Sequence, residues 1–338
     1  MATSPQSTSS AWAPFRVAPW FAERIWGVLD LHPWYDRSAD GGAPVGEAWL
    51  TGDQCLVASG LHAGKKLGEL FDQNPAALMG PAAPPSDSAA AGSASPLLIK
   101  VIFARGKLSV QVHPDDRMAR KYGDPRGKTE CWYVLDAAPG AKVACGLRPG
   151  VTLDEVKAGI AAGALEESLN LLDLARGEVI YVDSGTVHAI WPGSILLETQ
   201  QNCDLTYRMY DYGRERELHI GKALEALRLT TRAGKILPLE LAGRSLLVEG
   251  DYFRVERIDI TGARTGASLQ GGDEPAHGLQ YLFVAKGAAR VTGPCFETLE
   301  VPMGGIVAVP AASPEFAVHD LGGLTLIRIT PRWPKGIR

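Results

Sequence analysis

The sequence is most constrained by one apolar stretch, residues 97–113, which reads LLIKVIFARGKLSVQVH. Side chains alternate between the two faces of a β-strand, so Gln111 and His113 are expected to point to the same side. Glu130 opens a second apolar run, and a Gly-framed turn further along the chain leads to His188. Gln111, His113, Glu130 and His188 together form a candidate four-ligand set for a divalent metal ion.

Strand patterns cover most of the chain. Runs rich in β-branched residues, broken by Gly, Pro and Asp, extend from 97 to 149 and return at 178–182 and 195–201. A second group of strands begins near Ser245 and is expected at 252–260, 279–285, 305–310 and 324–330. The pattern resembles the cupins and predicts a mainly β fold. We expect a cupin jelly-roll barrel carrying the metal site, a few helices, and a second, smaller cupin-like β domain.

The length of 338 residues favours about two domains. We expect a loose N-terminal tail over 1–14, a catalytic cupin domain over 15–240 and a C-terminal cupin-like β domain over 241–338. The C-terminal domain contains His277 and His319, but neither has a second ligand type at a useful spacing. This domain is therefore predicted to be structural.

Two segments interrupt the strands of the catalytic domain. The stretch from Pro81 to Pro96 is a low-complexity run of Pro, Ala and Ser, which predicts a mobile loop without chemistry. Thr152 and Glu155 form a capping box at the start of an apolar-periodic stretch. A helical segment is therefore expected over 152–172.

Composition excludes several classes of protein. The formal charge of −4 shows no basic excess, so nucleic acid is not an expected partner. No apolar run approaches the roughly 18 residues that a membrane span needs. The first ten residues lack the pattern of a signal peptide, so a cytoplasmic location is expected. The five cysteines contain no CxxC pair, which argues against a Cys-based zinc site.

The ligand types point to zinc. Cupin metal motifs commonly have two His two residues apart, whereas here Gln111 stands in place of the first. An amide oxygen in place of an imidazole gives a harder donor set of two nitrogens and two oxygens. This set suits zinc better than copper or redox-active iron. Protein ligands that leave coordination positions open indicate a catalytic site.

Charged residues near these motifs indicate an anionic substrate. Lys100 lies within the apolar run LLIKVIF, where a buried ammonium group needs a partner or a ligand. Glu198 has a similar setting in ILLETQQ, and Glu47 is a weaker candidate in PVGEAWL. Arg208 and Arg214 follow, and guanidinium groups match phosphate geometry. The alternative, that these two arginines only pair with neighbouring carboxylates, stays open.

Several pieces of the chain together resemble the type I mannose-6-phosphate isomerases, above all their short bacterial form. The likeness extends from about residue 15 to residue 235 and continues weakly through the C-terminal β block. It implies a zinc-dependent cupin enzyme that interconverts mannose 6-phosphate and fructose 6-phosphate through a cis-enediol, with one Zn²⁺ per chain. The pieces that carry it are RIWG (24–27), PVGEAWL (44–50), LLIKVIFARGKLSVQVHPDD (97–116), GKTECWYVL (127–135), GTVHAI (185–190) and LLETQQNCDLTYRMYDYGR (196–214).

The resemblance also implies roles for single residues. Lys128 would lie beside the metal as a candidate for proton transfer, and Arg208 would stabilise the enediolate. The implied zinc ligands are Gln111, His113, Glu130 and His188. The chain departs from the family pattern at Cys203, where Ser is more usual, and in the long Pro81–Pro96 loop.

The remaining roles concern the substrate. Ser109 and Arg214 fall where the family contacts phosphate, and Lys100 and Glu198 match polar positions that line the cavity. A base must move a proton between C1 and C2 of the sugar. Lys128, Glu198 and a metal-bound water are all candidates for it.

Other functions stay open at this point. One is a cupin metalloenzyme that acts on another phosphosugar or with O₂, and another is a non-enzymatic sugar-binding cupin. The expected ligand is a small phosphosugar, and the chain is expected to be a monomer or a weak homo-oligomer that binds neither nucleic acid nor membrane.

Overall fold

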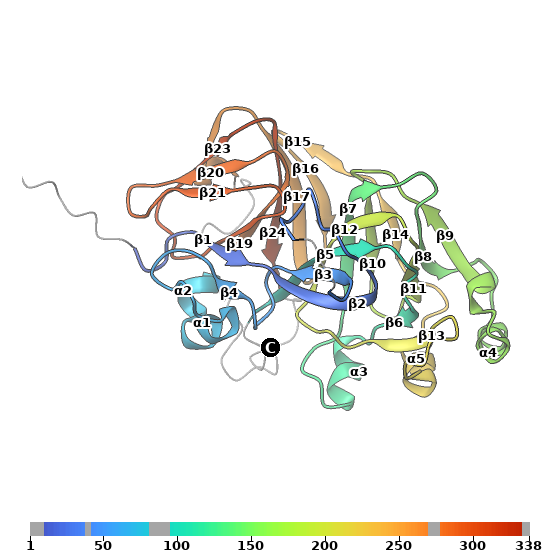
Figure 1. Cartoon of the computed structure of the whole chain (residues 1–338). Coiled ribbons are helices and arrows are strands. Elements are labelled where there is room, and N and C mark those ends of the chain that lie inside the picture. The colour runs from blue at the N-terminus through green and yellow to red at the C-terminus, as the bar shows by residue number, and fades with distance from the viewer. Residues whose placement is uncertain (1–9, 38–41, 81–94, 270–277, 333–338) are drawn as a thin grey trace, which may run out of the picture.

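The computed structural model in Figure 1 describes residues 10–37, 42–80, 95–269 and 278–332. Four antiparallel β-sheets and a few short helices make up these parts of the chain, so the prediction of a mainly β fold is confirmed. Most of the predicted Pro81–Pro96 loop and His277 lie outside the described residues. Ser95, at the end of that loop, is buried and donates its hydroxyl to the carbonyl of Leu97.

Two sheets carry the metal motifs. The seven-stranded sheet has the order β14 (Gly234–Ile236), β10 (Val179–Val182), β7 (Glu130–Ala137), β12 (Ser194–Gln201), β5 (Leu97–Ala104), β3 (Val45–Trp49) and β2 (Trp20–Val28). The five-stranded sheet has the order β13 (Tyr207–Tyr210), β6 (Val110–Val112), β11 (His188–Ile190), β8 (Lys142–Leu147) and β9 (Leu169–Asp173).

The other two sheets contain the strands β15 to β24, which form the C-terminal β unit, together with β1 and β4. The eight-stranded sheet has the order β15 (Leu239–Leu241), β16 (Arg244–Glu249), β17 (Phe253–Ile260), β24 (Leu324–Pro331), β19 (Gln280–Lys286), β22 (Ile306–Val309), β1 (Phe15–Ala18) and β4 (Leu56–Val57). The four-stranded sheet has the order β18 (Ala263–Thr265), β23 (Ala317–Asp320), β20 (Ala289–Thr292) and β21 (Leu299–Val301).

The helices lie outside the sheets. In Figure 1, α3, α4 and α5 lie together at the outer side of the five-stranded sheet, whereas α1 and α2 lie near β4. The helices are α1 (Leu67–Gln73), α2 (Pro75–Met79), α3 (Asp116–Lys121), α4 (Leu153–Ala162), α5 (Ile220–Ala226) and α6 (Gly266–Leu269), with a 3₁₀ turn at Leu165–Ser168.

Strand alternation separates the core into layers. Within β5, Leu97, Ile99, Val101 and Phe103 face the eight-stranded sheet, whereas Ile102 and Ala104 face the five-stranded sheet. The first set belongs to a core shared by the seven- and eight-stranded sheets, which also contains Phe253 and Ile327. A separate core lies between the eight- and four-stranded sheets and contains Leu282, Val291, Val318 and Leu326.

The N-terminal strand β1 belongs to the predicted catalytic domain but pairs with a strand of the predicted C-terminal domain. β1 pairs antiparallel with β22, with Phe15 opposite Ala308, and also pairs with β4. The eight-stranded sheet therefore contains strands from both ends of the chain. The domain division at residue 240 stays a prediction.

Two boundary predictions need correction. The tail is not loose as far as residue 14: Trp12 packs against the shared core and against the His62 ring, and Ala13 is buried. Burial of the Trp12 ring offsets the cost of ordering this segment.

The helical segment starts as predicted, because the Thr152–Glu155 capping box is present at α4. Helix does not continue to residue 172, however. Residues Leu169–Asp173 form β9, which pairs with β8. Apolar residues at short spacing fit an edge strand as well as a helix, and here the hydrogen bonds to β8 favour the strand.

Three further findings concern the cysteines, His319 and the helices. All five cysteines are free. His319 is half-buried and its ring lies 2.9 Å from the hydroxyl of Thr292, which fits a satisfied polar residue. No helix in the described parts of the chain is long and apolar enough to cross a membrane.

Candidate metal centre and active site

The alternation of side-chain direction along β6, β7 and β11 places the predicted ligands close together. Val110 and Val112 pack in the core beneath the outer helices, so Gln111 between them faces inward. By the same rule, Glu130 shares the inward side of β7 with Trp132, and His188 shares the inward side of β11 with Ile190. These side chains therefore meet between the seven- and five-stranded sheets.

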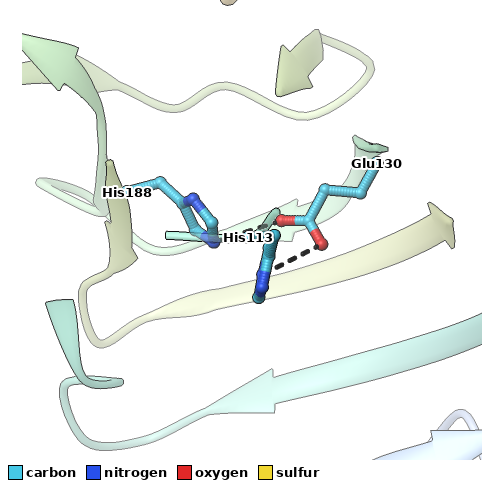
Figure 2. A group of neighbouring side chains, drawn as sticks. All are labelled: His113, Glu130 and His188. Atoms are coloured by element: carbon cyan, nitrogen blue, oxygen red, sulfur yellow. Dashed lines mark ion pairs between the residues drawn. The ribbon is translucent and has the colours of Figure 1, made fainter. Parts of the chain in front are cut away.

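Three of the four predicted ligands form a cluster that could hold a metal ion. One ligand atom each from His113, Glu130 and His188 lies within 4.8 Å of the others, and all three residues are buried (Figure 2). Nε2 of His113 lies 3.7 Å from one carboxylate oxygen of Glu130. Nε2 of His188 lies 3.3 Å from the other. As Figure 2 shows, both rings point toward the carboxylate.

Backbone carbonyls orient both imidazoles for ligation. Nδ1 of His113 lies 2.8 Å from the carbonyl oxygen of Leu205, and Nδ1 of His188 lies 2.9 Å from that of Thr186. A carbonyl only accepts hydrogen bonds, so each Nδ1 carries the proton and each Nε2 presents a lone pair to the cluster. Outer partners of this kind fix the tautomer of histidines that bind metal ions.

Burial keeps both imidazoles neutral. It lowers the pKa of His188 to about 4, and burial together with the Lys128 charge holds the pKa of His113 well below its usual range. Nε2 of His113 and both oxygens of Glu130 accept or donate no hydrogen bond within the described residues. One Glu130 oxygen also forms an ion pair with Lys128. Buried polar atoms that lack hydrogen bonds are costly, and a cation at this point would satisfy all three. The donor set therefore fits a metal ion.

Gln111 adjoins this cluster. It lies opposite His188 in the β6–β11 pairing, and its Nε2 is 3.2 Å from Nε2 of His188. Ser109 donates its hydroxyl to Oε1 of Gln111 at 3.3 Å. A half-turn of the amide would exchange its two ends and present Oε1 to the cluster.

The cluster lies beside a polar pocket of about 450 Å³. Of the predicted site residues, Lys100, Ser109, Gln111, Lys128, Glu198 and Arg208 line this pocket. Glu47, the weaker candidate, lines it too. The lining is completed by Arg24, Trp26, Ile102, Leu108, Ile190, Asp204, Leu205, Thr206 and Arg216.

Opposite charges alternate along the wall of the pocket. Nζ of Lys128 lies 2.9 Å from Glu130 and 3.9 Å from Glu198, and Nζ of Lys100 lies 3.4 Å from the same Glu198 oxygen. Burial opposes the charged form of Lys128, but the carboxylates of Glu130 and Glu198 outweigh it, so the Lys128 pKa lies above its ordinary value. The other Glu198 oxygen accepts from the indole N–H of Trp132 at 2.9 Å.

Lys100 anchors a second part of the wall. Its Nζ lies 3.1 Å from Asp204 and 3.9 Å from Glu47. Burial disfavours its charge, yet Asp204 and the two glutamates raise its pKa above the ordinary value. Glu47 also accepts from Arg24 at 3.0 Å and from the Trp49 indole at 2.6 Å. A lysine with these partners stays protonated.

Of the two predicted arginines, only Arg208 reaches the pocket. It lies opposite Gln111 in the β13–β6 pairing and donates to the carbonyl of Glu217. Burial and the nearby Arg216 charge lower its pKa. Arg214 is not among the lining residues, and all three of its guanidinium nitrogens donate to Asp211 or to the Lys107 carbonyl.

Sequence patterns missed three charged residues of the pocket. Arg216 lines it while its Nε and one terminal nitrogen bind the buried Asp211. Arg24 and Asp204 complete the set. Arg24 lies in RIWG, a segment with an uncommon concentration of Trp and Gly, and that composition was the available signal. Arg216 lies beyond a turn through which strand alternation does not continue.

The fold and the cluster define a mainly β protein with a buried site that could hold a metal ion beside a charged pocket. The model of the type I phosphomannose isomerase catalytic domain matches residues 15–140. The chain is 35% identical over 277 residues to "Probable mannose-6-phosphate isomerase GmuF" of Bacillus subtilis (strain 168), covering 76% of this chain and 83% of that protein. It is 34% identical over 256 residues to the mannose-6-phosphate isomerase of Streptococcus mutans, covering 71% and 77%.

A solved structure extends the likeness to the whole fold. The crystal structure of the mannose 6-phosphate isomerase from Bacillus subtilis superposes with a TM-score of 0.78 at 30% identity, and covers 94% of this chain and 99% of that one. The chain belongs to the type I mannose-6-phosphate isomerase family.

Proposed function

We propose that this chain interconverts mannose 6-phosphate and fructose 6-phosphate with the help of one Zn²⁺ ion. The observation that carries the proposal is the buried His113–Glu130–His188 cluster beside a pocket of about 450 Å³ with lysines and arginines on its wall. Family membership supports the same reaction. The enzyme is accordingly an aldose–ketose isomerase.

The zinc ligands in this proposal are Gln111, His113, Glu130 and His188. Two neutral imidazole nitrogens, one carboxylate and one amide oxygen suit zinc. When bound, zinc acts as a Lewis acid that polarises the sugar carbonyl and lowers the barrier to removal of the neighbouring C–H proton.

Positively charged side chains would bind the phosphosugar. Arg208 and Arg216 lie on the same pocket, and guanidinium groups match phosphate oxygens. We propose Arg216 for the phosphate contact in place of Arg214, because the donors of Arg214 are already used. Ser109 and Lys100 are proposed as further substrate contacts.

Lys128 and Glu198 are the candidates for proton transfer. The isomerisation removes a proton from one of the carbons C1 and C2 and returns a proton to the other, through a cis-enediol. Lys128 lies beside the metal cluster, and one buried oxygen of Glu198 accepts no hydrogen bond within the described residues. This oxygen lies 3.4 Å from Nζ of Lys100 and 3.9 Å from Nζ of Lys128, so it can accept the proton and the adjacent lysines can return one. Arg208 is placed to stabilise the negative charge that develops on the enediolate.

The remaining expectations stand as parts of this proposal. The chain acts in the cytoplasm, as a monomer or a weak homo-oligomer, on a small phosphosugar. Nucleic acid takes no part in the reaction.

Isomerisation of mannose 6-phosphate by the purified protein, before and after chelation, tests the proposal. We expect activity to disappear on chelation and to return with Zn²⁺. Inorganic phosphate should inhibit competitively. A protein that binds zinc stoichiometrically but does not turn over mannose 6-phosphate would contradict the isomerase function and favour a sugar-binding cupin.

A further inference from the structure

A hydrogen bond links the C-terminal β unit to the part of the molecule that contains the seven- and five-stranded sheets, the metal-site half. Tyr252 directly precedes β17 of the eight-stranded sheet, and its hydroxyl donates to one carboxylate oxygen of Asp116 at 2.9 Å. Asp116 is the first residue of α3, three residues after the predicted zinc ligand His113. The C-terminal unit therefore contacts the segment that follows a metal ligand.

The other oxygen of Asp116 supports the segment that leads into β7. It accepts from the backbone N–H of Gly127 at 2.8 Å and from the side-chain amide of Gln201 at 2.9 Å. The amide oxygen of Gln201 in turn accepts from the backbone N–H of Thr129 at 2.9 Å. Asp116 thus fixes Gly127 directly and Thr129 through one side chain.

These two backbone groups lie on either side of Lys128. The N–H of Lys128 itself donates to the carbonyl of Pro114 at 3.0 Å. A methyl group added at Gly127 would lie 2.4 Å from the carbonyl carbon of Asp115, so the segment is pressed against the start of α3. Small displacements of Asp116 are consequently passed on to the backbone that carries Lys128 and Glu130.

We propose that Tyr252 is a positioning residue for the isomerisation: through Asp116 it fixes the backbone on both sides of Lys128. This inference rests on the proposed function, and it gives the C-terminal β unit a part in turnover. The ammonium group of Lys128 must keep its position between Glu130 and Glu198. Misplacement of a reacting group by about 1 Å can cost about a hundredfold in rate.

Tyr252 is suited to this role as a donor. Burial raises the pKa of its phenol, and the nearby Asp116 charge raises it further. The hydroxyl therefore keeps its proton at any working pH, and Asp116 always has a donor at this position.

The molecule offers a matched control. Tyr35 also donates a phenol hydroxyl across the two halves, to the carbonyl of Gly304 at 3.0 Å, but it does not line the pocket. Tyr252→Phe and Tyr35→Phe each remove one oxygen and one hydrogen bond between the halves of the molecule. Only the first bond leads to Asp116.

The first measurement compares kcat, KM, bound zinc and Tm in these two variants and in the unmodified chain. We expect kcat of Tyr252→Phe to fall roughly tenfold or more, because the rate depends steeply on the position of the reacting group. KM, bound zinc and Tm should change no more than in Tyr35→Phe. Equal kcat in the two variants would overturn the inference. An inactive unmodified chain would instead overturn the proposed function.

Hydrogen exchange gives a readout that needs no activity. The amides of Gly127 and Thr129 should exchange faster in Tyr252→Phe than in Tyr35→Phe. Unchanged protection of both amides would overturn the inference.

A double-mutant cycle with Asp116→Asn tests the route. If Tyr252 acts through Asp116, the double variant should have a kcat close to that of the more impaired single variant. Fully additive losses would show that Tyr252 acts by another path.

Discussion

At the scale of single residues, Glu130 joins the metal cluster to the proton-transfer candidates. One of its oxygens lies 3.3 Å from His188 and the other 2.9 Å from Lys128. We expect Glu130→Gln to weaken zinc binding by more than the roughly hundredfold that follows loss of an outer partner. Competition with a chromogenic chelator measures this. Glu178→Gln, which alters a carboxylate paired with Lys235 at the surface, is the control and should bind zinc normally.

The two neighbouring arginines predict different effects on KM. Arg216→Ala should raise KM for mannose 6-phosphate roughly tenfold to a hundredfold, the equivalent of a lost charge-assisted hydrogen bond. Arg214→Ala should leave KM near its original value. Both variants should lower the free energy of unfolding by about 1–3 kcal/mol, because each removes donors from the buried Asp211. Steady-state kinetics and denaturant unfolding of both variants decide. A KM that rises in Arg214→Ala but not in Arg216→Ala would restore Arg214 to the phosphate site.

Strand spacing placed most of the predicted site residues around one pocket for a simple reason. Gln111, Glu130 and His188 each lie on a strand between core residues, so alternation fixes the side to which they point. Arg214 and Arg216 follow Tyr212 and Gly213, which have φ values of 57° and 77°. Positive φ angles reverse the chain direction, so the alternation of β13 does not continue to the arginines.

At the scale of elements, the turn before β7 sets the position of Lys128. We expect Gly127→Ala to cost about 1–3 kcal/mol by overpacking, because its new methyl group meets backbone atoms at the start of α3. Turnover should fall as well. Gly221→Ala in α5 is the control, since no atom lies within 4 Å of a methyl group there, and it should be neutral or slightly stabilising. Thermal unfolding and kcat of both variants test this, and a Gly127→Ala enzyme with unchanged values would contradict the proposed close contact.

Local sequence patterns predicted where helices and strands lie better than they predicted which strands pair. The capping box correctly located the start of α4, since capping involves residues within one turn. The sequence pattern predicts helix at the edge strand β9, because its leucines fit either period and its hydrogen bonds to β8 join distant residues. The pairing of β1 is not predicted for the same reason: its partner β22 lies nearly three hundred residues away, as Phe15 pairs with Ala308.

At the scale of the whole molecule, the core shared by the seven- and eight-stranded sheets determines how the chain unfolds. Phe253 and Ile327 from the C-terminal unit pack there with Val101 and Leu135 from the metal-site half. Neither half can therefore lose its structure without exposing apolar surface of the other. We expect the two halves to unfold together rather than as independent domains.

Phe253→Ala tests this coupling. The side chain is buried, so its truncation should lower the free energy of unfolding by about 3–5 kcal/mol. Because the core is shared, the unfolding midpoints measured by circular dichroism and by tryptophan fluorescence should shift together to lower denaturant concentration. Trp132 lies in the other half, beside His188 at 5.6 Å between ring centroids. If the C-terminal unit unfolded first while the tryptophan signal kept its original midpoint, the halves would be independent, and Tyr252 could not hold the segment that carries Lys128.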